Sequence, residues 1–185
     1  MIKLSTVIIT YNEEKNIEKC LQSVLPVSDE IVVLDSFSTD NTKTICEKYS
    51  VRFFTNKFEG HIEQKNLALS KTSFNHVLCL DADEELSVEL QQSILRVKQN
   101  WQYEGYVLNR LQNYCGKWIH HSGWYPDKKL RLFDKNKGKW GGVNPHDKVI
   151  LDNCNNTISL KGDLFHYSFH TIEQHVQQIN LFSSI

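Results

Sequence analysis

Residues 76–85 of the chain read His76-Val77-Leu78-Cys79-Leu80-Asp81-Ala82-Asp83-Glu84-Glu85. The apolar run at 77–80 predicts a buried strand that leads directly into two carboxylates spaced two residues apart. Because alternate side chains of extended backbone share a face, Asp81 and Asp83 can point toward one place. Mg²⁺ and similar cations are usually held by one or two carboxylates together with substrate phosphates. The stretch therefore predicts a divalent-cation site for a phosphorylated substrate, with an ordinary acidic surface turn as the alternative.

The residues before this stretch alternate short apolar runs with segments of helical periodicity, which predicts parallel strands covered by helices. We expect strands at 6–10, 31–34, 51–55 and 77–80, with helices between them. Asn12 is the expected N-cap of the first helix, and Ser38-Thr39-Asp40-Asn41 is the expected cap of a second helix that reaches Tyr49. Polar residues follow three of the strands, at the edge where parallel sheets bind ligands. The fold class expected is α/β, with a mostly parallel central sheet and a nucleotide-type crevice.

The residues after 86 have a different character. A helix is expected at 87–99, and the segments 103–114 and 129–133 alternate apolar with polar residues, as half-exposed strands do. An aromatic loop is expected between them at 118–126. Thr171 and Gln174 fit a capping box that opens a last helix. That helix runs to Ile185 without a stop signal, so we expect the natural protein to continue beyond it.

Composition excludes several classes of function. The chain has 185 residues and a net charge of -1 without a long basic run, so we expect no nucleic-acid partner. Its five widely spread cysteines indicate reduced residues in an intracellular protein. The first apolar segment is too short for a signal peptide or a spanning helix, so we expect a cytoplasmic protein, with peripheral contact to the inner face of a membrane left open. Without a G-x-G-x-x-G or a Walker-type loop, a dinucleotide cofactor or P-loop mechanism lacks its usual support.

Several ordered motifs resemble the family 2 glycosyltransferases of the GT-A fold. The first four are VIITYNEE at 7–14, LDSFSTDNT at 34–42, QKN at 64–66 and LDADE at 80–84. The likeness continues through GWYPD at 123–127, RLF at 131–133, VNPHD at 143–147 and the segment around 166. Within the family, the chain is most similar to bacterial β-glucosyltransferases of lipopolysaccharide core biosynthesis. The resemblance implies one GT-A domain over 1–185, with a nucleotide-sugar-binding half at 1–85, an acceptor-side half at 86–170 and the start of a C-terminal helix at 171–185.

The resemblance also implies an activity and a site. The activity is inverting transfer of a hexose, with glucose as a candidate, from a UDP-sugar to a glycan or glycolipid acceptor in lipopolysaccharide or cell-surface polysaccharide biosynthesis. The implied cofactor is Mg²⁺ or Mn²⁺, held by Asp83, Asp81 and His166, and Asp147 matches the catalytic base. The candidate residues for the nucleotide-sugar site are Thr10, Tyr11, Glu13, Asp35, Lys65, Asp81 and Arg131.

Each assignment has an alternative. Asp147 can simply end a turn, and Asp127 and Asp134 are rival bases. His166 can be a packed structural residue, and Arg131 can decorate an exposed strand face. The aromatic residues that could stack on sugar rings can equally close a core; they are Trp118, Trp124, Tyr125 and Trp140.

Two other functions stay open. A sugar nucleotidyltransferase would normally need a glycine-rich basic loop near the first strand, where the sequence reads Tyr11-Asn12-Glu13-Glu14. A binding module for nucleotide sugars would bind UDP without turning over a donor. Donor turnover with Mg²⁺ or Mn²⁺, against UDP binding without product, distinguishes these functions.

Overall fold

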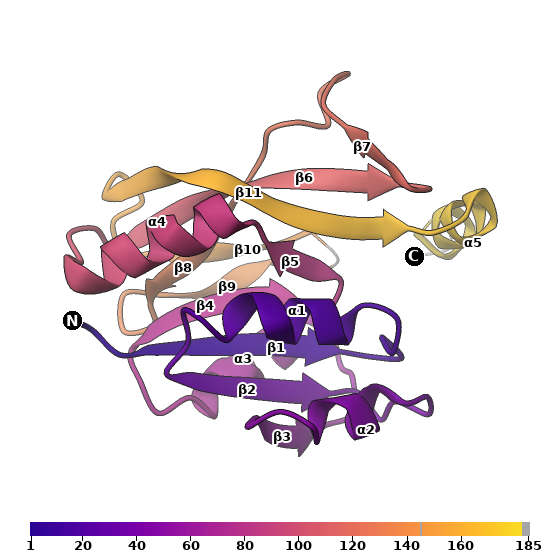
Figure 1. Cartoon of the computed structure of the whole chain (residues 1–185), viewed down its shortest axis with the longest axis horizontal. Helices are drawn as coiled ribbons and strands as arrows, with labels where there is room; N and C mark the ends of the chain where they lie inside the picture. The colour runs from indigo at the N-terminus through magenta and orange to yellow at the C-terminus, as the bar shows by residue number, and fades with distance from the viewer. Residues whose placement is uncertain (145, 183–185) are drawn as a thin grey trace.

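A computed structural model describes residues 1–144 and 146–182 of the chain. Pro145 of the 143–147 motif and the last three residues of the expected final helix lie outside this description. The first half of the chain alternates strands with helices (Figure 1). Its elements are β1 (Leu4–Thr10), α1 (Ile17–Val24), β2 (Glu30–Asp35), α2 (Thr42–Cys46), β3 (Arg52–Thr55), α3 (His61–Ser70) and β4 (His76–Asp81).

The second half consists mainly of strands. Its two helices are one that packs along β11 and one at the end of the described chain (Figure 1). The elements are β5 (Glu84–Leu86), α4 (Val88–Gln99), β6 (Gly105–Tyr114), β7 (Lys117–Ile119), β8 (Asp127–Asp134), β9 (Gly138–Val143), β10 (His146–Leu151), β11 (Thr157–Phe169) and α5 (Ile172–Phe182).

A continuous sheet joins the two halves of the described chain. Its strand order is β3-β2-β1-β4-β8-β6-β11-β5, with β7 paired to β6. The strands β3, β2, β1 and β4 are parallel, whereas β8 pairs antiparallel with both β4 and β6. The register places Thr10 beside Asp35, and Ile9 beside Asp81. The polar residues that follow β1, β2 and β4 in the sequence therefore meet at one edge, as expected from parallel strands.

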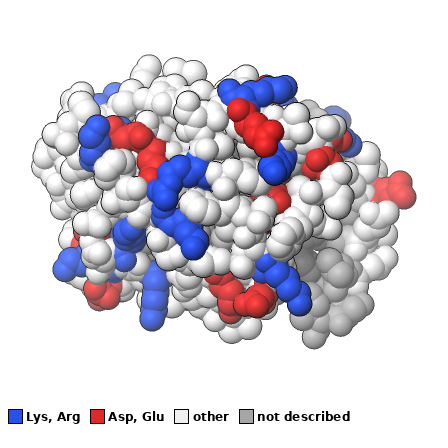
Figure 2. Space-filling model, turned by 90° about the horizontal axis from the view of Figure 1, so that it is seen from below, with Lys and Arg blue, Asp and Glu red and all other residues white. Residues whose placement is uncertain are grey.

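The two faces of the sheet bury different side chains. On one face, residues such as Ile8 and Leu80 pack against α1 and α4. On the other face, Val7 and Cys79 pack with α3 and with the two-stranded sheet of β9 and β10. This alternation follows the period of two of a strand and explains why the run at 77–80 is apolar throughout. The outer surface carries charges of both signs, which are interspersed on the face drawn in Figure 2.

The expected start of the first helix and the expected end of the second are wrong in detail. The first helix begins at Ile17 with Asn16 as its N-cap, not at Asn12. Asn12 has a φ of 53°, and its side chain accepts a hydrogen bond from the Thr39 backbone N–H at 2.8 Å, so it ties two loops together. The second helix is shorter than expected because it ends at Cys46 rather than at Tyr49. The first error arises from a contact between loops that are distant in the sequence.

The final helix begins as expected. The Thr171 hydroxyl accepts from the Gln174 backbone N–H at 3.2 Å, and the Gln174 side chain accepts from the Thr171 backbone N–H at 3.3 Å. These reciprocal bonds form a capping box. Ile172, Val176 and Ile179 of α5 are exposed. No helix within the described residues combines the length with the apolar character that crossing a membrane requires.

The strand β11 brings distant residues to the site through an irregular register. It runs parallel to β6, and the pairing shifts between Ser159 and Asp163. Gly162 lies inside this shift with a φ of +91°. A Cβ at Gly162 would collide with the backbone of Glu89 and Leu90 at the start of α4. Glycine therefore allows β11 to approach α4 closely and to continue in the register that pairs His166 with Gln112.

We predict that Gly162→Ala lowers the free energy of unfolding by about 3 kcal/mol or more, because backbone strain and a backbone clash add. Gly116→Ala is the matched control, since Gly116 has a φ of +82° and open space around its Cβ position. The control should lose only about 1 kcal/mol. Urea unfolding of both variants measures the difference, and equal losses would contradict the proposed close approach.

Candidate active site

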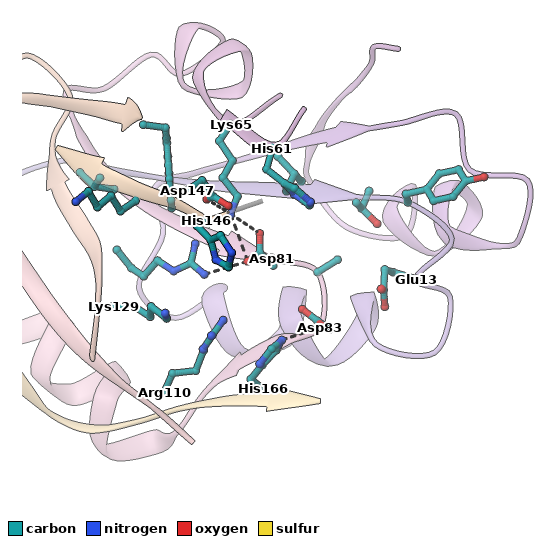
Figure 3. Close-up of a pocket in the computed structure, with 18 of the residues that line it drawn as sticks. Glu13, His61, Lys65, Asp81, Asp83, Arg110, Lys129, His146, Asp147 and His166 are labelled. Atoms are coloured by element: carbon teal, nitrogen blue, oxygen red, sulfur yellow. Dashed lines mark hydrogen bonds and ion pairs between the residues drawn. The ribbon is translucent and has the colours of Figure 1, made fainter. Parts of the chain in front are cut away.

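A cavity of about 880 Å³ opens beyond the carboxyl ends of β1 and β4 (Figure 3). The residues that line it come from both halves of the chain, including the loop after β1, the helix α3 and the strands β6, β8, β10 and β11. Nine of the ten residues predicted from the sequence line this cavity: Thr10, Tyr11, Glu13, Lys65, Asp81, Asp83, Arg131, Asp147 and His166.

Lys65 and Arg131 hold the carboxylate of Asp81 from two sides. The Nζ atom of Lys65 lies 3.1 Å from Oδ1 of Asp81, and Nη2 of Arg131 lies 2.9 Å from Oδ2. Both cationic side chains are buried, with exposed fractions of 7% and 5%. Burial raises the pKa of Asp81, but the charges of Lys65 and Arg131 outweigh it and hold that pKa well below its usual range. Asp81 is therefore a fixed anion whose described partners are cationic side chains.

Arg131 also neutralises a carboxylate that has no contact with solvent. Its Nη2 lies 3.1 Å from Oε1 of Glu84, whose side chain is 0% exposed. The other carboxylate oxygen of Glu84 accepts from the Asp81 backbone N–H at 3.0 Å. Nε and Nη1 of Arg131 have no hydrogen-bond partner among the described residues, although the guanidinium lies over the ring of Trp140 at 5.3 Å. Glu84 and Arg131 thus fix the turn that carries Asp81 and Asp83.

Asp147 reaches the same cluster from the separate two-stranded sheet. Lys65 donates to Oδ2 of Asp147 at 2.8 Å, so a single ammonium group connects Asp81 with Asp147. The strand β9 is attached to α3 by Asn66, whose side chain accepts from the Trp140 backbone N–H at 3.1 Å and donates to its carbonyl at 2.9 Å. A hydrogen bond from the Ile62 backbone N–H to Asn144 adds a second attachment. The geometry accounts for the presence of Lys65 and Asn66 in one short motif.

Asp83 and His166 form a second pair in the cavity. Nε2 of His166 lies 3.1 Å from Oδ2 of Asp83, and Nδ1 lies 2.5 Å from Oε1 of Gln112. Because an amide oxygen only accepts, Nδ1 carries the proton and Nε2 faces Asp83. Burial lowers the pKa of His166, but the carboxylates of Asp83 and Glu84 together outweigh it, so the net pKa is above its ordinary value.

This pair fits a divalent cation. A cation could replace the proton between Nε2 of His166 and Asp83, and Gln112 would keep the imidazole in the tautomer that a metal needs. Among the described residues, no group of three or more His, Cys, Asp or Glu side chains is arranged to hold a metal ion. Two protein ligands match the way Mg²⁺ is commonly held, with waters and substrate phosphates completing its shell. Ligation by Asp81 stays a prediction, since its carboxylate faces Lys65 and Arg131.

Glu13 lies near Asp83, on the side of the cavity formed by the loop after β1 (Figure 3). Its side chain accepts from Asn16 at 2.8 Å, and its backbone N–H donates to Thr42. Burial, followed by the charge of Asp83, raises the pKa of Glu13 to about 7. Glu13 therefore carries a proton over much of the pH range in which other carboxyl groups are ionised.

Two predicted residues of the nucleotide site have other surroundings. Tyr11 is 59% exposed at the rim of the cavity. Asp35 is buried and does not line the cavity, and its carboxylate accepts from the backbone N–H and the hydroxyl of Ser38 at 2.8 and 2.5 Å. The neighbouring Ser36 lines the cavity instead. Contact between Asp35 and a uracil ring stays a prediction.

Sequence reasoning missed three residues that organise the site. Arg110 and Gln112 lie two positions apart on β6 and contact residues of the cavity, and Glu84 neutralises Arg131. Trp140, which the sequence offered as a ring for sugar stacking or core packing, packs against both cations. The spacing of Arg110 and Gln112 places them on one face of an expected strand, and this was the available signal. Nothing in the sequence alone indicates that Glu84 is buried while Glu85 is partly exposed.

A protein-family model described as Glycosyl transferase family 2 matches residues 5–151. The chain is 34% identical over 194 residues to the "Uncharacterized glycosyltransferase RT0209" of Rickettsia typhi, with 100% of this chain and 66% of that protein covered. It is 26% identical over 190 residues to the lipopolysaccharide core biosynthesis glycosyltransferase LpsC of Rhizobium meliloti, with 100% of this chain and 70% of that protein covered. The chain spans about two thirds of the length of the curated relatives that it matches.

Solved structures share the fold. The S. aureus TarS 1-349 complex with UDP-GlcNAc has a TM-score of 0.64 at 20% identity, covering 92% of this chain and 60% of that one. Glucosyl-3-phosphoglycerate synthase from Mycobacterium tuberculosis, in complex with Mn²⁺, UDP and phosphoglyceric acid, has a TM-score of 0.54 at 18% identity, covering 73% and 56%. The expected fold class is confirmed: an α/β GT-A arrangement with a mostly parallel central sheet and a smaller antiparallel portion.

We predict that Arg131→Met lowers the free energy of unfolding by about 3–5 kcal/mol, because Asp81 and the fully buried Glu84 lose their shared cation. Adding Glu84→Gln to that variant should restore part of the loss. Lys43→Met is the control, since Lys43 forms an exposed ion pair with Glu47 that should contribute less than about 1 kcal/mol. Denaturant unfolding measures the free energy of unfolding of all three variants. A loss in Arg131→Met as small as that in Lys43→Met would contradict the ion-pair network.

We predict that Glu13 destabilises the fold as the pH rises from about 5 to 7. In this window the folded protein retains a proton on Glu13, whose pKa is raised to about 7, whereas the unfolded chain has released it. The free energy of unfolding should therefore fall with rising pH, by roughly 3 kcal/mol from this group. Glu13→Gln should remove that component. The free energy of unfolding of both proteins is measured with urea between pH 5 and 7. An equally steep fall in the two proteins would rule out the raised pKa.

Proposed function

The chain belongs to glycosyl transferase family 2, and on this premise we propose that it transfers a hexose from a UDP-sugar to a hydroxyl of a glycan or glycolipid acceptor, with inversion at the anomeric carbon. The observation that carries the proposal is the convergence of nine predicted residues in one cavity. These residues come from segments as distant in sequence as the loop after β1 and the strand β11. An unrelated use of the fold would not require this convergence.

In the proposed complex, the nucleotide lies near the loop after β1, where Thr10, Tyr11 and Glu13 line the cavity. The diphosphate lies toward Asp83 and His166, and a bound Mg²⁺ or Mn²⁺ supplies charge neutralisation for the departing group. The Mn²⁺ and UDP named in the solved synthase complex support the use of a divalent cation with a uridine nucleotide. Lys65 and Arg131 are buried and held by carboxylates, so they keep Asp81 and Asp147 in place with little freedom.

Asp147 is the proposed general base. A carboxylate oxygen takes the proton of the acceptor hydroxyl while the acceptor oxygen bonds to the anomeric carbon and the bond to the diphosphate breaks. The bonding electrons leave with UDP, and a single displacement needs no covalent intermediate. General-base assistance of this kind contributes about 10²- to 10⁴-fold to the rate. The ion pair with Lys65 at 2.8 Å fixes the direction of the Asp147 carboxylate.

The proposed acceptor rests on the likeness to one relative rather than on the family match. LpsC of Rhizobium meliloti is named for lipopolysaccharide core biosynthesis and aligns with the whole of this chain. On that likeness we place the proposed reaction in the assembly of lipopolysaccharide or another cell-surface glycan. In this proposal the reaction takes place in the cytoplasm with a UDP-sugar as the donor. A glycolipid acceptor would bring the protein to the inner face of the membrane.

We predict that Asp147→Asn lowers kcat by at least about 100-fold and leaves the dissociation constant of UDP within about twofold, because the base acts on the acceptor proton. The measurement is UDP release from a panel of UDP-sugars with Mg²⁺ or Mn²⁺ and a lipopolysaccharide-core preparation as acceptor. UDP binding is followed separately by its cation-dependent thermal stabilisation of the protein.

Asp134→Asn is the matched control, because Asp134 ends β8 and does not line the cavity. It should retain full turnover. Asp127→Asn tests the rival base directly. Undiminished turnover by Asp147→Asn would move the base elsewhere, and failure of UDP to stabilise the unaltered protein at any cation concentration would overturn the proposed function.

A further inference from the structure

A separate cavity of about 430 Å³ adjoins the large one on its β6 side. It shares Asp83, Arg110, His166 and Gln178 with the large cavity, and its other lining residues are different. Those include Gln112, Gly123, Trp124, Asp127, Ser168 and Phe169. We propose that this cavity, the Trp124 subsite, binds a neutral pyranose unit of the acceptor. The inference rests on the proposed function and names the chemistry of the group that the acceptor must carry.

The polar groups of the Trp124 subsite are fixed and mutually paired. Oδ2 of Asp127 accepts from Nε and Nη2 of Arg110 at 2.9 and 2.7 Å, and from the amide nitrogen of Gln112 at 3.3 Å. Arg110 also lies 3.4 Å from Glu84, and Gln112 holds His166. Planar guanidinium, carboxylate and amide groups held in this way offer donors and acceptors at set positions. This is what recognition of neighbouring sugar hydroxyls requires.

The charge balance of the Trp124 subsite favours a neutral ligand. Each of its cationic side chains already has a carboxylate partner: Arg110 has Asp127 and Glu84, and His166 has Asp83. Lys128 and Lys148 line the large cavity and have no acidic partner within 4.0 Å among the described side chains, but neither lines the subsite. Apart from the cation proposed at Asp83 and His166, which the donor diphosphate would occupy, a phosphate or carboxylate would therefore find no unpaired cation there. Hydroxyl groups can share the existing hydrogen bonds without burying an unpaired charge.

Trp124 provides the apolar surface that a pyranose ring needs. Its side chain is 38% exposed in a loop shaped by Ser122 and Gly123, whose φ angles are 60° and 75°. The ring of Tyr114 supports it edge-on, with centroids 5.9 Å apart and an interplanar angle of 84°. An indole face held at the wall of a polar cavity can cover the C–H face of a sugar, while the polar groups bind its hydroxyls. The shared residues Asp83 and His166 then bring the sugar beside the proposed transfer centre.

The test measures binding of methyl glycosides, independently of turnover. The α- and β-methyl pyranosides of glucose, galactose and mannose are titrated by saturation-transfer NMR in the presence of UDP and diamagnetic Mg²⁺. We expect binding of at least one glycoside by the unaltered protein, and a dissociation constant raised about tenfold in Trp124→Ala. Trp124→Phe should lose less, because it keeps an aromatic face. Galacturonate and glucose 6-phosphate should bind no better than the neutral glycosides.

Trp118→Ala is the matched control. Trp118 is 36% exposed, similar to Trp124, but it does not line the subsite. Its ring packs on that of Phe165, with the ring centroids 4.8 Å apart. It should leave glycoside binding unchanged, and thermal stabilisation by UDP should remain in all three variants. Glycoside binding that survives Trp124→Ala, or that is absent from an unaltered protein that binds UDP, would overturn the Trp124 subsite alone. Preferred binding of the anionic sugars would overturn its neutrality. Failure to bind UDP would instead overturn the proposed function, and the inference with it.

Discussion

The site depends on compensation among charges that the fold removes from water. At the carboxyl edge of the parallel strands, Arg131 and Lys65 both pair with Asp81. Arg131 also pairs with Glu84, and Lys65 also pairs with Asp147. Each of these groups would be costly to bury alone, because an unpaired charge in a protein interior loses several kcal/mol of hydration. Together they form a set in which every member fixes the position of another. The geometry of the proposed site is therefore a consequence of charge compensation at the sheet edge.

The sequence predicted the parallel half of the fold well, because its strands are apolar throughout and its helices have a clear period. The convergence of Thr10, Asp35 and Asp81 at one edge followed from parallel pairing alone. The strands β5, β7, β9, β10 and β11 were not predicted. Apolar and polar residues alternate poorly along β11, and its register shifts at Gly162. It also pairs with β6 across a long stretch of chain, so its neighbours in sequence give little information about it. Local patterns identify residues, whereas long-range pairing decides which of them meet.

The same limit applies to the site. Asp81, Asp83 and Lys65 were identified from motifs, but their division into two separate clusters was not. In the structure Asp81 faces Lys65 and Arg131, and Asp83 faces His166. The two aspartates are two residues apart, yet their partners come from different elements: α3 and β8 for Asp81, and β11 for Asp83. Glu84, Arg110 and Gln112 determine this division, and their importance follows from burial and strand register, which a single sequence does not reveal.

The hairpin that carries Asp147 and the strand that carries His166 differ in how soon they can form as the chain folds. The ribbon of β9 and β10 joins segments that are adjacent in sequence, so the hairpin carrying Asp147 closes a short loop at small entropic cost. The strand β11 must instead return to β6 across β7, β8, β9 and β10 before His166 can reach Gln112 and Asp83. We expect the Asp83–His166 pair to assemble late. A nascent chain should thus acquire the proposed base well before it acquires the proposed cation site.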